Sequence, residues 1–201
     1  MCDDDPKYTI TINGDSDVED PSHEEGSWTV YSFCDKHVNC EQKDRFFFDS
    51  GKAKPIVNRK LRVGLAFVLS YYEHGLGLWT VAGTGPQCQW DNTRFAGIAV
   101  WEDPPSHMGS KTYEDRKKDC AAFLEEYTDW CNGNCHWIQL VCSDPAQSIE
   151  PTIGGLIGNN SLINAIQEIL PDDATSENTV FDGDGKYIVD YHDVFKKLTP
   201  A

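Results

Sequence analysis

Three residue types that together perform nucleophilic catalysis gather around one turn of this 201-residue chain. The segment GPQCQWDN, residues 85–92, contains Cys88 and Asp91, and His74 lies a short way upstream. A thiol that is activated by an imidazole, itself oriented by a carboxylate, can attack an electrophilic carbon. However, the order and spacing match no protease signature, and the chain lacks a GxSxG elbow. A Cys-dependent enzyme built on these three residues is therefore the third of three functional hypotheses.

Cysteine pairs suggest a second kind of chemistry, zinc binding. The segments CDKHVNC (34–40) and CNGNCH (131–136) each place two thiols close to a His. Their C-x5-C and C-x3-C spacings are wider than the C-x2-C of most structural zinc sites. We therefore expect no metal cofactor. The zinc ligands of the weaker alternative are Cys34, Cys40, Cys131 and Cys135.

Acidic residues near the N-terminus resemble part of a calcium loop. Asp15, Asp17 and Glu19 alternate with other residues and Asp20 follows directly, but the central Gly and the terminal Glu of a calcium loop are missing. The simpler interpretation is a turn capped by the side chains of Asp15 and Asp17.

Two glycine-rich segments are candidates for holding a phosphate. They contain Gly83 and Gly85, and Gly154 and Gly155, and the second segment precedes a predicted helix. Backbone N–H groups before a helix can bind an anion, although no P-loop or dinucleotide fingerprint is present. The basic stretch that ends in Lys60 and Arg62 would supply positive charge. A small-molecule or nucleotide-sequestering protein is the second functional hypothesis.

Charge is the strongest global property. The chain has 33 acidic and 17 basic residues, a net charge of −16. This charge opposes binding to nucleic acid or anionic membranes and favours a basic partner, although it also serves solubility. The longest apolar run, 63–69, is far shorter than a membrane span. The acidic N-terminus does not resemble a secretory signal, so we expect a reducing compartment and free thiols.

Hydrophobic patterns indicate which elements would position these residues. Alternation predicts strands at 8–12, 27–34, 76–83, 95–101 and 136–142. A helix is predicted to begin after a cap residue, either Thr112 or Ser110, and to end near residue 131. A second helix is predicted over 160–171, a loop over 43–60, and a last strand within 182–195. The residues 61–75 fit either a strand or a helix. The expected class is α+β, a single domain with a mainly antiparallel sheet and two helices in its second half.

We expect three segments along the chain. They are an acidic segment with a short first strand (1–26), a globular core (27–171) and an acidic tail (172–201).

The order of several motifs resembles a family of uncharacterised bacteriophage proteins. The motifs are INGDSDVEDPSHEEG, YYEHGLGLWTV, CQWDNTRFAGIAVW and EEYTDWCNGNCHWIQL, which together lie between residues 10 and 158. The chain departs from the family pattern at Asn92–Arg94, and Cys131 and Cys135 are not part of it, which weakens the zinc alternative. The matching positions are Asp15, Asp17, Pro21, His74, Gly75, Cys88, Trp90, Asp91, Gly97, Tyr127, Trp130 and Gly133.

This resemblance implies a phage setting and no established activity. The first hypothesis is therefore an accessory protein of the host cytoplasm that binds and inhibits a host protein, one of defence or nucleic-acid handling. Its acidic segments 13–25 and 168–193 would cover a basic surface, and exposed aromatic side chains would anchor the contact. The predicted contact residues are Asp15, Asp17, Glu19, Asp20, Tyr72, His74, Trp90 and Asp91.

Overall fold

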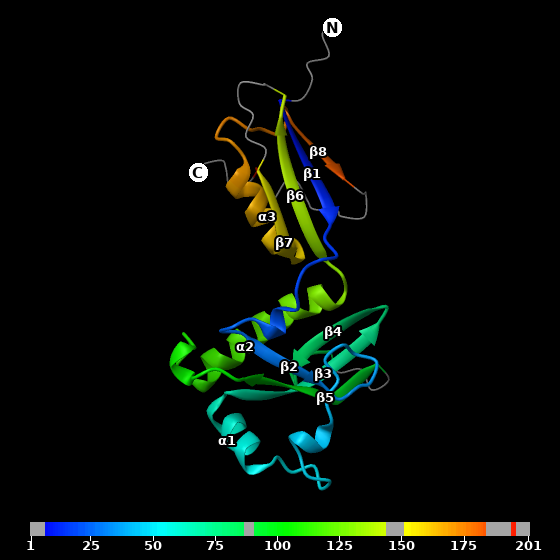
Figure 1. The fold of residues 1–201 in the computed structure, drawn as a ribbon, viewed down its shortest axis with the longest axis vertical. Coiled ribbons are helices and arrows are strands. Elements are labelled where there is room, and N and C mark those ends of the chain that lie inside the picture. Colours follow the sequence, from blue (N-terminus) through cyan, green and yellow to red (C-terminus); the bar gives the residue numbers. More distant parts are fainter. Residues whose placement is uncertain (1–6, 87–90, 144–150, 184–193, 196–201) are drawn as a thin grey trace. The chain divides into compact units, whose positions relative to one another are not determined.

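The structure, a computed structural model, describes residues 7–86, 91–143, 151–183 and 194–195 (Figure 1). It confirms the α+β class, with two four-stranded sheets that are mostly antiparallel. Contacts gather in two compact units, residues 1–19 with 133–201 and residues 20–132, which we name the terminal unit and the central unit. The expected segments 1–26, 27–171 and 172–201 do not coincide with these units, because strands from both ends of the chain pair with each other.

The terminal unit is one sheet with one helix on it. Its strands are β1 (Tyr8–Gly14), β6 (Cys135–Cys142), β7 (Thr152–Ile157) and β8 (Thr179–Gly183), in the order β7-β6-β1-β8. Strand β1 runs antiparallel to β6 and parallel to β8. Its alternating sequence turns Tyr8, Ile10 and Ile12 inward, where they pack with buried residues of α3 (Gly158–Ile169).

The central unit is a sheet with helices on both faces (Figure 1). Its strands are β2 (Trp28–Ser32), β3 (Ala66–His74), β4 (Leu76–Val81) and β5 (Asn92–Trp101), in the order β2-β5-β3-β4. Helix α2 (Tyr113–Cys131) covers one face, and α1 (Pro55–Val63) packs with phenylalanines on the other. Short 3-10 turns lie at Pro21–His23, Lys43–Arg45 and Pro105–His107.

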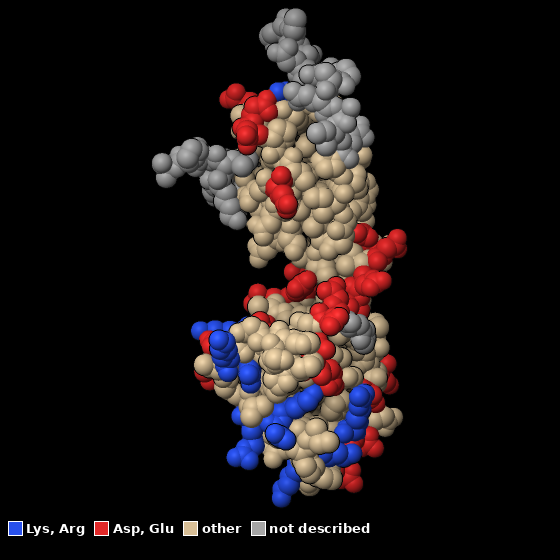
Figure 2. Space-filling view, turned by 60° about the vertical axis from the view of Figure 1, so that its left-hand side comes forward, with Lys and Arg blue, Asp and Glu red and all other residues tan. Residues whose placement is uncertain are grey.

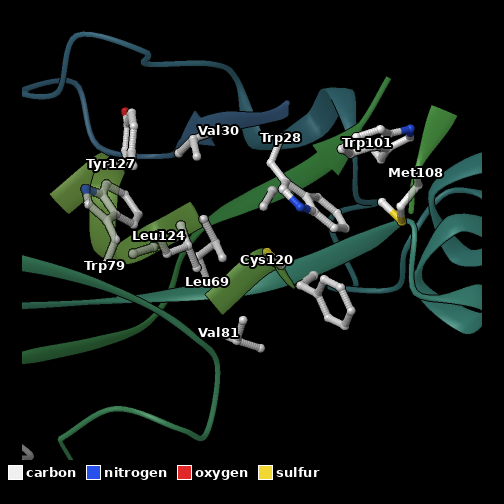
Figure 3. Packing of buried hydrophobic residues seen from close by; sticks show 13 residues of the cluster. Trp28, Val30, Leu69, Trp79, Val81, Trp101, Met108, Cys120, Leu124 and Tyr127 are labelled. Atoms are coloured by element: carbon white, nitrogen blue, oxygen red, sulfur yellow. The ribbon is translucent and has the colours of Figure 1, made fainter. Parts of the chain in front are cut away.

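Helix α2 is held on the sheet by apolar packing and by side chains at its ends and middle. Leu124 and Cys120 are buried against Trp28, whose indole N–H donates to Asp119 Oδ2 at 3.1 Å (Figure 3). The amide of Trp79 donates to Thr128 Oγ1 at 3.0 Å, so the helix also binds the backbone of β4. Thr112 caps the helix as predicted, accepting a hydrogen bond from the Asp115 amide.

Several elements differ from the predicted ones or were left open by the sequence. Residues 55–60 belong to α1 and not to a loop, because Pro55 stands at the first turn, where proline is favoured, and Gly64 ends the helix with φ of +72°. The ambiguous residues 61–75 are the end of this helix followed by β3. Strand β7 was not predicted, since its glycines obscure any alternation. The last described strand is Thr179–Gly183, and most of 182–195 lies outside the described residues.

Removal of one buried side chain of α2 tests this packing. Leu124 is 1% exposed, so Leu124→Ala should lower the free energy of unfolding by about 2–5 kcal/mol through lost contacts and a cavity. Urea unfolding followed by circular dichroism measures this change. Glu125→Ala, at the exposed neighbouring position, should change it by less than about 0.5 kcal/mol. Equal effects of the two substitutions would contradict the described burial.

Candidate functional site

The end of β3 brings together two of the three predicted catalytic residues. His74 Nδ1 lies 3.7 Å from Asp91 Oδ2, and the Glu73 amide donates to the backbone carbonyl of Asp91 at 3.0 Å. The rings of Tyr72 and His74 stack with centroids 6.4 Å apart. Cys88 lies outside the described residues, as does Trp90. The His74 side chain is 76% exposed, so its contact with Asp91 is solvated and weak.

A cavity of about 550 Å³ opens between β3, β5 and the loop that follows β2. We name it the β3–β5 cavity. Its walls combine aromatic rings, two carboxylates, an ammonium, an imidazole and a thiol. The lining residues are Phe33, Cys34, Asp35, Lys36, His37, Tyr71, Glu73, Thr93, Phe95 and Ala96.

His37 is the most constrained polar side chain of this cavity. Its Nδ1 lies 2.7 Å from the hydroxyl of the fully buried Ser32, which also accepts a hydrogen bond from the Cys34 amide. The imidazole packs edge-on against Tyr71 and Trp79, at centroid distances of 4.6 and 5.1 Å. Burial lowers the pKa of His37 below its usual 6.5, while the nearby Glu73 carboxylate acts in the opposite direction. The imidazole is therefore neutral at neutral pH.

This arrangement is better suited to binding than to nucleophilic catalysis. Carboxylates from Asp35 and Glu73 beside the rings of Phe33, Tyr71 and Phe95 suit a cationic group. Tyr71 and the predicted contact residue Tyr72 are separated, since adjacent side chains of a strand point to opposite faces. Tyr71 lines the cavity, and Tyr72 lies with His74. His37 was expected only as part of a zinc segment, because nothing local in CDKHVNC shows that this loop folds over β3.

The predicted metal ligands do not converge. Among the residues that the structure describes, no three His, Cys, Asp or Glu side chains form a group that could hold a metal ion. Cys34 is half-buried in the β3–β5 cavity, Cys40 and Cys131 are exposed, and Cys135 is buried in the terminal unit.

The acidic turn at residue 15 has a structural role in the terminal unit. Asp15 Oδ1 accepts a hydrogen bond from the Asp17 amide at 3.1 Å, as expected for a capped turn. Its Oδ2 accepts another from the Gly155 amide at 2.9 Å. The Gly155 amide, which a phosphate at Gly154 and Gly155 would need as a donor, is therefore already hydrogen-bonded to Asp15. This removes support for a phosphate site at these glycines.

The other predicted ligand residues are also engaged locally. Gly83 has φ of +88° in the turn after β4, where the Thr84 amide donates to the Val81 carbonyl. Gly85 packs against Thr80 in the same turn. Lys60 donates to the Trp101 carbonyl at 2.8 Å and to Glu102 at 2.7 Å, while Arg62 is exposed in the last turn of α1. These positions do not form one nucleotide site.

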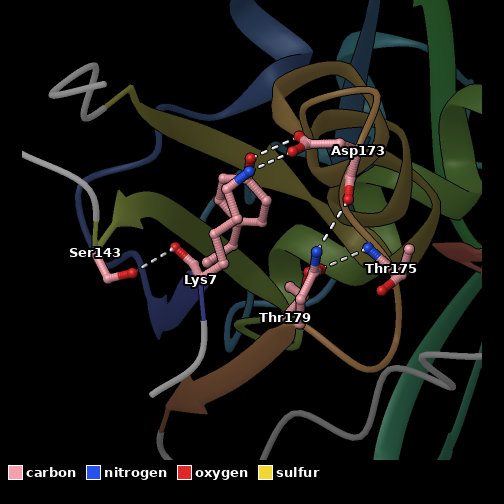
Figure 4. Close-up of polar contacts among 7 residues, drawn as sticks. Lys7, Ser143, Asp173, Thr175 and Thr179 are labelled. Carbon is pink, nitrogen blue, oxygen red and sulfur yellow. Dashed lines mark hydrogen bonds and ion pairs between the residues drawn. The ribbon is translucent and has the colours of Figure 1, made fainter. Parts of the chain in front are cut away.

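Negative charge is distributed unequally between the two units. By sequence, the terminal unit has 16 acidic and 4 basic residues, against 17 and 13 in the central unit. In Figure 2 nearly all visible Lys and Arg side chains lie on the central unit. Asp173 is one acid with an internal role, since it binds Lys7 and the Tyr8 hydroxyl (Figure 4), and these contacts lower its pKa. Glu19 and Asp17 are exposed, and Asp20 accepts a hydrogen bond from Asn39 in the central unit.

Comparisons with known proteins identify no relative of this chain. No family model matches the chain, and neither a curated protein nor a solved structure matches it. The resemblance to phage proteins therefore stays a prediction. None of the described helices has the length and apolar character needed to cross a membrane.

The pKa of His37 tests the geometry of the β3–β5 cavity. An NMR titration of its imidazole should give a pKa below 6.5, because burial opposes the charged form. Glu73→Gln should lower this pKa further, since it removes a carboxylate that favours the imidazolium. Asp35→Asn, at another carboxylate of the cavity, is the matched control and should shift it less. An unchanged His37 pKa in Glu73→Gln would show that the Glu73 carboxylate does not act on this imidazole.

Proposed function

We propose that the protein is a binding protein whose terminal unit engages a basic surface of another protein. In the phage setting that the motif order suggests, this partner is a host protein of defence or nucleic-acid handling, which the contact inhibits. The observation that carries the proposal is the excess of 16 acidic over 4 basic residues in the terminal unit.

Six acidic side chains that the structure describes in this unit are available for an external partner. Asp17, Glu19, Glu168, Asp172, Glu177 and Asp182 are all exposed, and within the described residues none of them forms an ion pair. Fields of exposed charges extend about 10 Å at ordinary salt, so the acids attract a basic surface and direct its approach. The same field repels nucleic acid.

The central unit contributes little to this long-range attraction. Its acidic and basic residues nearly balance, and several are paired with each other, as Arg45 is with Glu41 and Lys60 with Glu102. Electrostatic steering of a basic partner should therefore depend on the terminal unit.

Two matched charge variants test this assignment. One carries Asp17→Asn, Glu19→Gln, Asp172→Asn and Glu177→Gln in the terminal unit. The other carries Glu25→Gln, Asp44→Asn, Asp49→Asn and Glu125→Gln at exposed positions of the central unit. Both lose four negative charges, and both spare Asp15 and Asp173, which hold the terminal unit together. Calorimetric titration with deca-lysine should show a larger loss of affinity for the terminal-unit variant.

Two further measurements test the proposal: the salt dependence of binding and the capture of a partner from a host lysate. Affinity of the wild-type chain for deca-lysine should fall at least tenfold from about 50 to about 500 mM NaCl, since screening weakens charge pairs. A host-lysate protein captured by the wild type should be retained by the central-unit variant and lost by the terminal-unit variant. Equal losses in both variants, or binding that is indifferent to salt, would refute the proposal.

A further inference from the structure

A second cavity of the central unit, of about 470 Å³, lies between α1 and the sheet face that this helix covers. We name it the α1 cavity. Its floor is apolar: Phe46, Ala66 and Val100 line it and are no more than 5% exposed. The helix contributes Val57 and the apolar side chain of Ile56, which is 76% exposed. Its volume is in the usual range of small-molecule sites, about 300–1,000 Å³.

Cations surround this apolar floor. Arg45, Lys54 and Lys60 line the cavity, with Glu102 as its one acidic lining residue. Lys60 is fixed by Glu102, and Arg45 is bound to Glu41 at 2.6 Å with its guanidinium 5.2 Å from the Phe46 ring. In the described part of the chain, the ammonium of Lys54 makes no ion pair or hydrogen bond. One cation at the rim is therefore available for an external anion.

The start of α1 adds to this positive rim. Pro55 is its first residue, and Lys54 at the N-cap supplies no side-chain hydrogen bond to the first turn. The partial positive charge of a helix N-terminus therefore lies at the rim, next to Lys54.

The apolar floor and the single rim cation that is unpaired among the described residues indicate which class of ligand fits the α1 cavity. A nucleotide polyphosphate would need several unpaired cations or a glycine cradle, and the α1 cavity has neither. A neutral apolar compound would leave the Lys54 ammonium without a counterion. We propose that the α1 cavity binds a small monoanion with an apolar body, such as a medium-chain or aryl carboxylate. The body would lie on Phe46, Ala66 and Val100, with the carboxylate at Lys54.

A comparison of decanoate with decanol separates recognition of the carboxylate from recognition of the alkyl chain. In calorimetric titrations of the full-length protein, decanoate should bind saturably at one site and more tightly than decanol. Lys54→Gln should weaken decanoate binding about five- to tenfold and leave decanol binding unchanged, because a charge-assisted contact is lost. Lys52 is an exposed lysine nearby in the sequence and does not line the cavity. Lys52→Gln should therefore change the affinity neither for decanoate nor for decanol.

A second variant locates the site. Val57→Trp places a large side chain from α1 toward the cavity, which Val57 lines, and should abolish decanoate binding in protein whose circular dichroism spectrum shows that it is folded. Absence of saturable decanoate binding to the wild type overturns the proposal. Equal effects of Lys54→Gln and Lys52→Gln, or full binding by a folded Val57→Trp, also overturn it. The terminal-unit charge variant should bind decanoate normally, so this result is independent of the proposed function.

Discussion

Strand β3 is covered on both faces, and this packing positions both cavities of the central unit. Phe67 and Leu69 point toward α2, whereas Ala66 and Val68 point toward α1 and the phenylalanines at 46 and 47. A strand buried on both sides must be apolar along most of its length. Its polar residues therefore lie in its second half, from the buried Ser70 onward, where Tyr71 and Glu73 line the β3–β5 cavity. At the other end of the strand, Ala66 lies in the floor of the α1 cavity.

The terminal unit depends on a different constraint, the insertion of β1 between β6 and β8. All seven residues of β1 pair with β6, from Tyr8 opposite Cys142 to Gly14 opposite His136. This register buries Ile10 and Ile12 under α3 and brings Asp15 to the amide of Gly155. The carboxylates that hold the unit together, Asp15 and Asp173, are thereby distinct from the exposed ones that form no ion pair within the described residues. That distinction allows the external charge to be changed without unfolding the unit.

The two units present different surfaces to a partner. Acidic residues are in large excess in the terminal unit, and six of those that the structure describes are exposed without an ion pair to another described residue, which favours attraction over a distance. The central unit is nearly neutral and contains the cavities, where affinity comes from burial and from a few placed polar groups. The two proposals therefore assign a basic macromolecule to one unit and a small anion to the other.

The sequence by itself determined the elements whose signal is local. Alternation in YTITI and HWIQLVC predicted β1 and β6, and apolar spacing with the Thr112 cap predicted α2. The capped turn at Asp15 also followed from nearby residues. In each case the determining interactions lie within a few residues along the chain, so a pattern of residue types is sufficient.

Only the tertiary structure decided what these elements bring together. The hydrogen bond from the Gly155 amide to Asp15 joins residues 140 positions apart. Because of it, the glycine segment predicted to hold a phosphate binds a carboxylate of the protein instead. The packing of His37 on Tyr71 and Trp79, and the floor of the α1 cavity, are likewise assembled from segments distant in sequence. Helix α1 was missed because the Gly, the Pro and the basic residues of 43–60 suggested a loop, whereas contacts of Val57 and Leu61 with the sheet stabilise a helix there. Such contacts depend on strand order and register, which local periodicity does not encode.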